Sequence, residues 1–149
     1  MAEGKSSCPG FEHLEHTADV IVVGRGRTLE EAFEYAGVGV YEVMTDTSMV
    51  RPARRVDIDV EGDDVENLLY RWIEELLLYT DTEGLVFGMF RVCRIARENG
   101  RYRIVSSAWG EPFDPERHEE RTEVKAMTYA QMEITRQEDC WRIQFVVDI

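Results

Sequence analysis

Residues 64–80 carry apolar side chains at helical spacing along one face, and no other stretch restricts the fold as strongly. The apolar positions follow i, i+3, i+4 and i+7 spacing: Val65, Leu68, Leu69, Trp72, Ile73, Leu76 and Leu77. Gly62-Asp63-Asp64 precedes them and supplies a helix start. A helix that is apolar on one face must bury that face against another layer of structure. The pattern therefore predicts an amphipathic helix that covers part of a sheet.

Alternating residues elsewhere predict the strands of that sheet. Val56, Ile58 and Val60 alternate with charged side chains, as in a strand with one buried face. Asn99-Gly100 suits a two-residue hairpin turn and joins the strands predicted at 86–98, with a bulge, and at 101–109. The remaining predicted strands lie at 11–14, 20–23, 124–136 and 141–148.

A second helix is predicted over 28–44. Thr28 and Glu31 form a capping box at its start, and apolar residues follow at helical spacing. Gly37 and Gly39 lie inside it and lower its intrinsic stability. The element order predicts one α+β domain, with two helices packed on one face of a largely antiparallel β-sheet. Residues 1–10 are expected to be a disordered lead, and residues 11–149 the domain.

Composition restricts the kinds of binding partner and the cellular compartment that we expect. The net charge of −13 disfavours direct, stable nucleic-acid binding, and suits divalent cations or a basic protein partner. Cys8, Cys93 and Cys140 show no CxxC spacing, so we expect neither a zinc site nor a disulfide framework. Without a signal peptide or an apolar run of membrane length, the sequence predicts a cytoplasmic protein with reduced thiols and no membrane contact.

The chain end, Phe145-Val146-Val147-Asp148-Ile149, combines an apolar strand pattern with two adjacent carboxylates. Asp19 is a further acid in apolar company, just before Val20-Ile21-Val22-Val23. An oxygen-only ligand set suits hard cations such as Ca²⁺, Mg²⁺ or Mn²⁺. The alternative is that Asp19 caps a turn and Asp148 is a solvated strand end, and periodicity alone favours this alternative.

Other candidate residues carry weaker signals. His16, in the turn after the first strand, could hold a carboxylate in place, whereas a zinc role lacks further ligands. Lys125 lies among apolar residues and could pair with a buried acid, or could simply face outward from an alternating strand. No nucleophile–base pair and no phosphate-binding or metalloprotease motif is present, which disfavours an independent hydrolase.

Several motifs, in order along nearly the whole chain after residue 10, resemble the archease family. They are HTADV (16–20), TLEEAF (28–33), MTDT (44–47), EGDDVENLLYRWIEELL (61–77), WGE (109–111), EVKAMTY (123–129) and VVDI (146–149). The resemblance implies an accessory protein of tRNA splicing, itself not an enzyme. It would activate the RNA-splicing ligase RtcB by promoting guanylylation of that ligase and multiple turnover. The alternative implied role is that of a chaperone for a tRNA methyltransferase, with a structural metal ion.

The resemblance also implies a metal site made of Asp19, Asp148 and Ile149, the same three residues that the chemistry of the sequence singles out. We place His16, Lys125, Tyr129 and Asp46, which fall within these motifs, on the functional surface. The chain departs from many members of the family after the TY of EVKAMTY, where it has Ala130 instead of histidine. A role of that histidine cannot be transferred to this protein.

Overall fold

The computed structural model describes residues 8–15 and 19–149. Its helices are α1 (Leu29–Met44) and α2 (Val65–Glu83), with a 3₁₀ turn η2 (Thr47–Met49) after the first. The strands are β1 (Gly10–Glu15), β2 (Asp19–Gly26), β3 (Arg54–Gly62), β4 (Leu85–Glu98), β5 (Arg101–Pro112), β6 (Ala126–Met127), β7 (Glu133–Gln137) and β8 (Cys140–Asp148). Strand β1 begins at Gly10, one residue before the predicted start of the domain, and residues 1–7 of the predicted lead lie outside the described residues.

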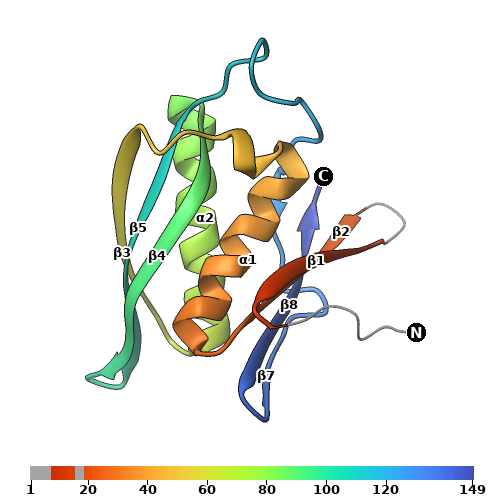
Figure 1. The fold of residues 1–149 in the computed structure, drawn as a ribbon. Coiled ribbons are helices and arrows are strands. Elements are labelled where there is room, and N and C mark those ends of the chain that lie inside the picture. The colour runs from red at the N-terminus through yellow and green to blue at the C-terminus, as the bar shows by residue number, and fades with distance from the viewer. Residues whose placement is uncertain (1–7, 16–18) are drawn as a thin grey trace.

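The strands are antiparallel and form two sheets, with both helices between them (Figure 1). The first sheet has the order β1-β2-β8-β6, with β7 also paired to β8, and the second has the order β3-β5-β4. The predicted α+β class, with two helices and antiparallel strands in one domain, is confirmed. The strands divide into two sheets where the sequence suggested one, because α1 packs against both β2 and β4.

The two glycines of α1 explain how one helix fits between two sheets. A Cβ atom on Gly39 would lie 2.6 Å from Cγ1 of Val22 in β2. A Cβ atom on Gly37 would lie 3.2 Å from the rings of Phe90 in β4 and Trp72 in α2. The absent side chains therefore let α1 approach both layers closely, and this packing offsets the low helix propensity of glycine.

The predicted capping box of α1 is present. The Glu31 amide donates to Oγ1 of Thr28 at 3.0 Å, and Oε1 of Glu31 accepts from the Arg27 amide at 2.7 Å. The carboxylate thus reaches one residue further back than the motif predicts. Two N–H groups at the start of the helix are satisfied in this way.

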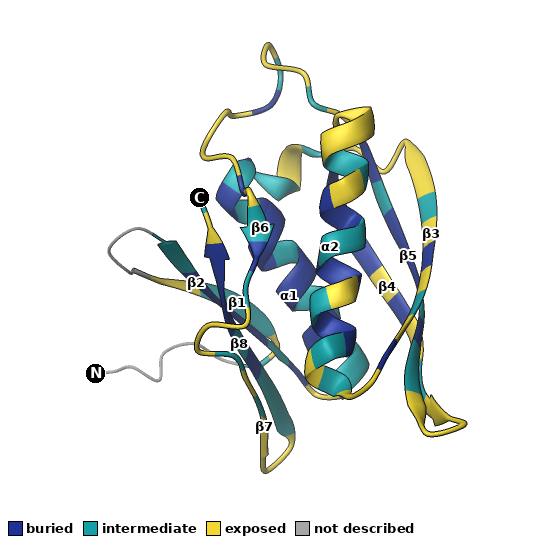
Figure 2. Cartoon of the chain, turned by 180° about the vertical axis from the view of Figure 1, so that it is seen from behind, coloured by how far each residue is buried: buried dark blue, intermediate teal, exposed yellow. Residues whose placement is uncertain are grey.

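Helix α2 is anchored between the sheets by its predicted apolar face, which is buried from Leu68 to Leu77 and partly buried at Val65 (Figure 2). Its indole is fixed by a polar chain, since Nε1 of Trp72 donates to Oγ of Ser106, which donates to the Ile58 carbonyl. Gly84, at φ 70°, ends the helix in the left-handed conformation that glycine favours. Within the described residues, no helix is both long and apolar enough to cross a membrane.

The β4–β5 hairpin follows the sequence prediction closely. Asn99 and Gly100 both have positive φ, as a tight turn of this kind requires. The register between the strands shifts near Phe87 and again near Val92, so the expected bulge occurs twice. At the outer edge of β4, Oε2 of Glu34 from α1 accepts from the Val92 amide at 2.8 Å. A helix side chain thereby takes a hydrogen bond that another strand would otherwise take.

Two expectations for the second half of the chain are corrected. The single strand predicted at 124–136 is two short strands, β6 and β7, because Gln131 adopts a positive φ in a turn between them. The expectation of reduced thiols is wrong for Cys8 and Cys140, which form a disulfide with a Cα–Cα distance of 6.1 Å. These cysteines are 132 residues apart, so their spacing gave no sign of the pairing. Cys93 is free and exposed.

Candidate metal site at the carboxyl terminus

Asp19 and Asp148 lie directly opposite each other on neighbouring strands. They are Cα partners in the antiparallel ladder of β2 and β8, Asp19 as the first residue of its strand and Asp148 as the last. Side chains of directly opposite residues extend from the same face, with Cβ atoms about 4.5–5.5 Å apart. Two residues that are far apart in the sequence are therefore brought to one point of the sheet, as the site hypothesis requires.

This pair lies on the face of the sheet that points away from the helices. Val22 and Phe145 belong to the main core, on the helix side. Successive side chains of a strand point to opposite faces, and Asp19 and Asp148 lie an odd number of positions from Val22 and Phe145. They therefore share the outer face of the sheet with Ile21 and Val146. Asp148 is exposed and Asp19 is half-buried. The carboxylates are thus accessible from outside the domain.

The last residue is held by its side chain. Ile149 is partly buried against the main core, which fixes the backbone that carries the terminal carboxylate. On the other side of β8, Ala126 of β6 pairs with Asp148, and the Lys125 amide donates to the Asp148 carbonyl at 2.8 Å. Lys125 is exposed and immediately precedes β6. The structure therefore brings Lys125 beside the chain end. The strand predicted at 124–136 included Lys125, whereas β6 begins one residue after it.

The donor set fits a hard divalent cation. Carboxylate oxygens are the ligands that Ca²⁺, Mg²⁺ and Mn²⁺ prefer. Within 8–15 and 19–149, no three side chains of His, Cys, Asp or Glu form a metal-binding group. The ligand set that the family resemblance implies would add the α-carboxylate of Ile149 to Asp19 and Asp148 as a third source of oxygen.

The other residues placed on the functional surface are distributed as follows. His16 lies outside the described residues. Tyr129 is 49% exposed and stacks on Tyr70 of α2, with ring centroids 4.5 Å apart and planes 3° from parallel. Its hydroxyl accepts from Nδ2 of Asn67 at 2.8 Å. Tyr129 therefore joins the segment after β6 to α2.

Asp46 has a local structural role. It caps η2, with Oδ1 accepting from the amide of Ser48 at 3.1 Å and from its hydroxyl at 2.7 Å. These hydrogen bonds lower the pKa of the Asp46 carboxyl below its usual value. The arrangement accounts for an acid in this turn without a ligand.

A second polar cluster, which the sequence did not predict, is centred on Glu111 at the end of β5. Glu111 is 8% exposed, and its Oε2 accepts from the Arg51 amide at 2.8 Å. The same oxygen forms an ion pair with Arg117 and lies 2.9 Å from Nε2 of His118. Mainly because of Arg117, the pKa of Glu111 falls to about 2.

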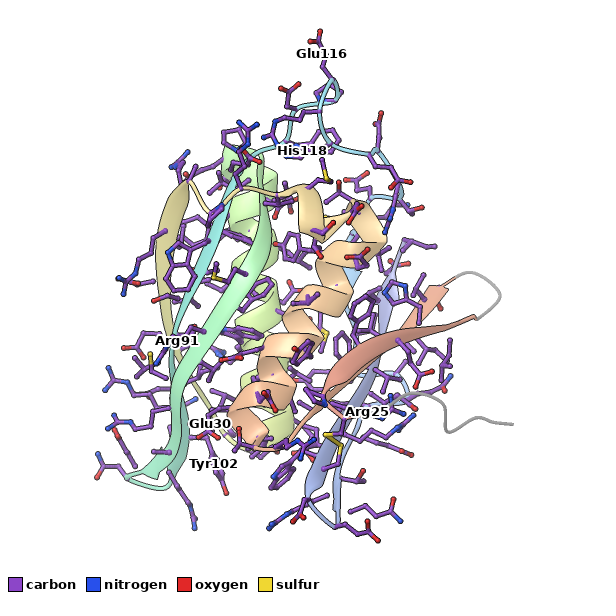
Figure 3. The ribbon with its side chains drawn as sticks, viewed as in Figure 1. Arg25, Glu30, Arg91, Tyr102, Glu116 and His118 are labelled. Carbon is purple, nitrogen blue, oxygen red and sulfur yellow. A yellow bond between two sulfur atoms is a disulfide. The ribbon has the colours of Figure 1, made fainter. Side chains whose placement is uncertain are left out.

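His118 completes this cluster from below the tip of the loop 113–125, while Glu116 projects from the tip (Figure 3). Nδ1 of His118 accepts from the Asp114 amide at 2.9 Å. The proton of the neutral ring therefore resides on Nε2, which donates to Glu111. The cluster fixes the loop that leads to Lys125. The sequence shows Glu111 in the WGE motif and His118 in the loop, but it does not show that both side chains are buried.

Comparison with known proteins gives a consistent result. The model of the archease protein family matches residues 11–149. The protein archease of Aeropyrum pernix is 67% identical over 142 residues, which cover 95% of this chain and 99% of that protein. The protein archease of Pyrococcus furiosus is 48% identical over 140 residues, covering 93% and 98% of the two chains.

Solved structures share the fold. The solution structure of Methanobacterium thermoautotrophicum protein 1598 has a TM-score of 0.82 and 38% identity, and the match covers 94% of this chain and 99% of that one. The crystal structure of an archease, possible chaperone, from Thermotoga maritima has a TM-score of 0.59 and 22% identity, covering 91% and 94%. The latter likeness concerns the fold alone.

Proposed function

Because the chain belongs to the archease family, we propose that it is an accessory protein of tRNA splicing that activates an RtcB-type RNA ligase. It promotes guanylylation of the ligase and multiple turnover, and it catalyses no reaction by itself. The observation that carries this proposal is the direct pairing of Asp19 with Asp148 beside the terminal carboxylate. That arrangement supports the ligand set that the family resemblance implies.

In this proposal, Asp19, Asp148 and the carboxylate of Ile149 hold a divalent ion, Ca²⁺, Mg²⁺ or Mn²⁺. Guanylylation joins a nucleotide phosphate to a histidine, and a bound ion offsets phosphate charge. The carboxylates lie at the outer end of the β2–β8 ladder, where a partner can reach them. Lys125, whose amide donates to the Asp148 carbonyl just before β6, is a candidate to contact the ligase or its nucleotide.

The test compares ligase–GMP adduct formation with the wild-type protein, with Asp148→Ala, and with a variant extended after Ile149. We expect the wild-type protein to raise adduct yield and turnover. Both variants should remain folded, because Asp148 is exposed, but should give no stimulation. Asp139→Asn, in the exposed β7–β8 turn, is the matched control and should stimulate fully. Full stimulation by both site variants would contradict the proposal.

The family resemblance also implies a second role, as a chaperone of a tRNA methyltransferase. The Thermotoga maritima protein is described as a possible chaperone. A light-scattering assay of methyltransferase aggregation, with and without this protein, separates the two roles. Protection that survives in Asp148→Ala would support a chaperone with a structural ion, whereas protection is not expected if ligase activation is the only role.

A further inference from the structure

A cavity of about 250 Å³ lies where the loop 113–125 passes the carboxyl ends of both helices. Both helices end on the side of the molecule that carries this loop (Figure 1). The walls include Met44 at the end of α1, Val86 in β4 and Phe113 in the loop. The lining is mostly apolar, and its volume is below the roughly 300–1,000 Å³ of typical small-molecule sites. It has room for one long side chain.

The rim of the cavity is acidic and exposed. Glu120 and Glu123 line it, with Arg121 and Thr122 between them. Arg121 is committed to other partners, since its guanidinium donates to Glu42 Oε2 at 2.9 Å and to Glu119 Oε1 at 3.0 Å. The two rim carboxylates are therefore not neutralised by the arginine that separates them.

The end of α2 adds to the negative potential. Gly84, the C-cap of α2, also lines the cavity, and the last turn of α2 contains no basic residue. A helix carboxyl end carries a partial negative charge of about half an electron. An apolar cavity with a negative rim suits a side chain with an aliphatic stem and a cationic head, which is the structure of lysine and arginine.

We propose that this cavity receives a lysine or arginine side chain from a basic segment of the partner protein. The identity of that partner as the RNA ligase rests on the proposed function. Glu123 is two residues before Lys125, whose amide binds Asp148. A partner docked at the cavity would consequently lie close to the carboxylate pair. The charge of −13 on the whole chain also favours approach of a basic surface.

Two variants test the docking surface by different means. Glu120→Gln/Glu123→Gln removes the rim charge, and Thr122→Phe fills the cavity mouth. Thr122 is exposed, and its hydrogen bond to the Val43 carbonyl comes from its backbone amide, which the substitution keeps. The charge-matched control is Glu138→Gln/Asp139→Asn in the β7–β8 turn, at the opposite end of the molecule (Figure 1).

The measurement is the Kd of the full-length protein for the purified RtcB-type ligase, by calorimetry at low and high salt, beside adduct formation. We expect Glu120→Gln/Glu123→Gln to weaken binding about fivefold at low salt and to reduce its salt dependence. Thr122→Phe should weaken binding at both salt concentrations, and the control should bind like the wild type. Wild-type affinity in both cavity variants would overturn the inference that the partner docks at the cavity, but not the proposed function. A wild-type protein that neither binds nor stimulates the ligase would overturn this inference and the proposed function together.

Discussion

Asp19 and Asp148 are paired across the β2–β8 ladder, so two carboxylates occupy adjacent positions on the outer face of the sheet. Like charges directly opposite in a sheet destabilise it. A divalent ion between them would convert this repulsion into attraction. The stability of the domain should therefore respond to divalent ions, and the response should depend on both acids.

Divalent ions should raise the thermal stability of the wild-type protein but not that of Asp148→Asn. At an ion concentration of about 100 Kd, linkage predicts a gain of about 2.7 kcal/mol, or ~5–10 °C in Tm for a domain of this size. Without ions, Asp148→Asn should be as stable as the wild type or slightly more stable, because the repulsion is removed. Calorimetry with Ca²⁺, Mg²⁺ or Mn²⁺ measures both effects, with Asp139→Asn as the control.

Extension of the chain tests the third ligand. Two residues added after Ile149 keep both aspartates but move the terminal carboxylate. We expect a smaller Tm increase with ions and weaker ion binding, measured by calorimetric titration. An extended protein with unchanged ion affinity would show that the carboxylate of Ile149 is not a ligand.

Glu111→Gln should destabilise the protein at neutral pH and lose this effect in acid. The pKa of Glu111 is lowered from 4.5 to about 2, so its carboxylate stabilises the folded state above pH 4.5. The contribution, about 3 kcal/mol from a shift of this size, is lost as pH falls from about 4.5 towards 2. Urea unfolding of both proteins between pH 7 and pH 2.5 measures the change.

The matched control for Glu111 is Glu116→Gln, in the same loop but at its exposed tip (Figure 3). This substitution should change the free energy of unfolding by less than about 0.5 kcal/mol at every pH. A difference between Glu111→Gln and the wild type that stays constant with pH would contradict the assignment of the low pKa to Glu111.

Local patterns were sufficient to predict the secondary structure that local interactions determine. The apolar face of α2, the capping box of Thr28 and the Asn99-Gly100 turn depend on residues within a few positions of each other. The division into two sheets depends on contacts of α1 with strands on either side of it. These contacts are long-range, and only the unusual Gly37 and Gly39 hinted at them.

For the candidate site, the sequence likewise pointed to individual residues but not to their arrangement in space. Asp19 and Asp148 stood out as acids in apolar strands, but their pairing depends on strand register, which periodicity does not specify. The family resemblance supplied that connection. The Glu111 cluster was missed because burial of a polar loop depends on tertiary contacts. The Cys8–Cys140 bond was missed for the same reason, since its ends meet only in the folded chain.

Reduction of the disulfide, or Cys140→Ser, should lower thermal stability. The bond joins residues 132 positions apart, so it restricts nearly the whole unfolded chain. The loop-entropy model gives about 4–5 kcal/mol for a loop of this length, equivalent to ~10–20 °C in Tm. Calorimetry with and without reductant tests this, with Cys93→Ser as the control that should be unchanged.

The stack of Tyr129 on Tyr70 permits a separation of stability from function. A parallel aromatic pair contributes about 0.5–1.5 kcal/mol beyond its area burial. We therefore expect Tyr129→Ala and Tyr70→Ala to show a coupling energy of that size in a double-mutant cycle, measured by urea unfolding.

Stimulation of the ligase by the two single variants is then compared at a temperature where both are fully folded. If Tyr129 belongs to the functional surface, as the sequence analysis predicts, its exposed ring should matter more, and Tyr129→Ala should stimulate less than Tyr70→Ala. Equal stimulation by the two variants would restrict Tyr129 to a structural role between the segment after β6 and α2.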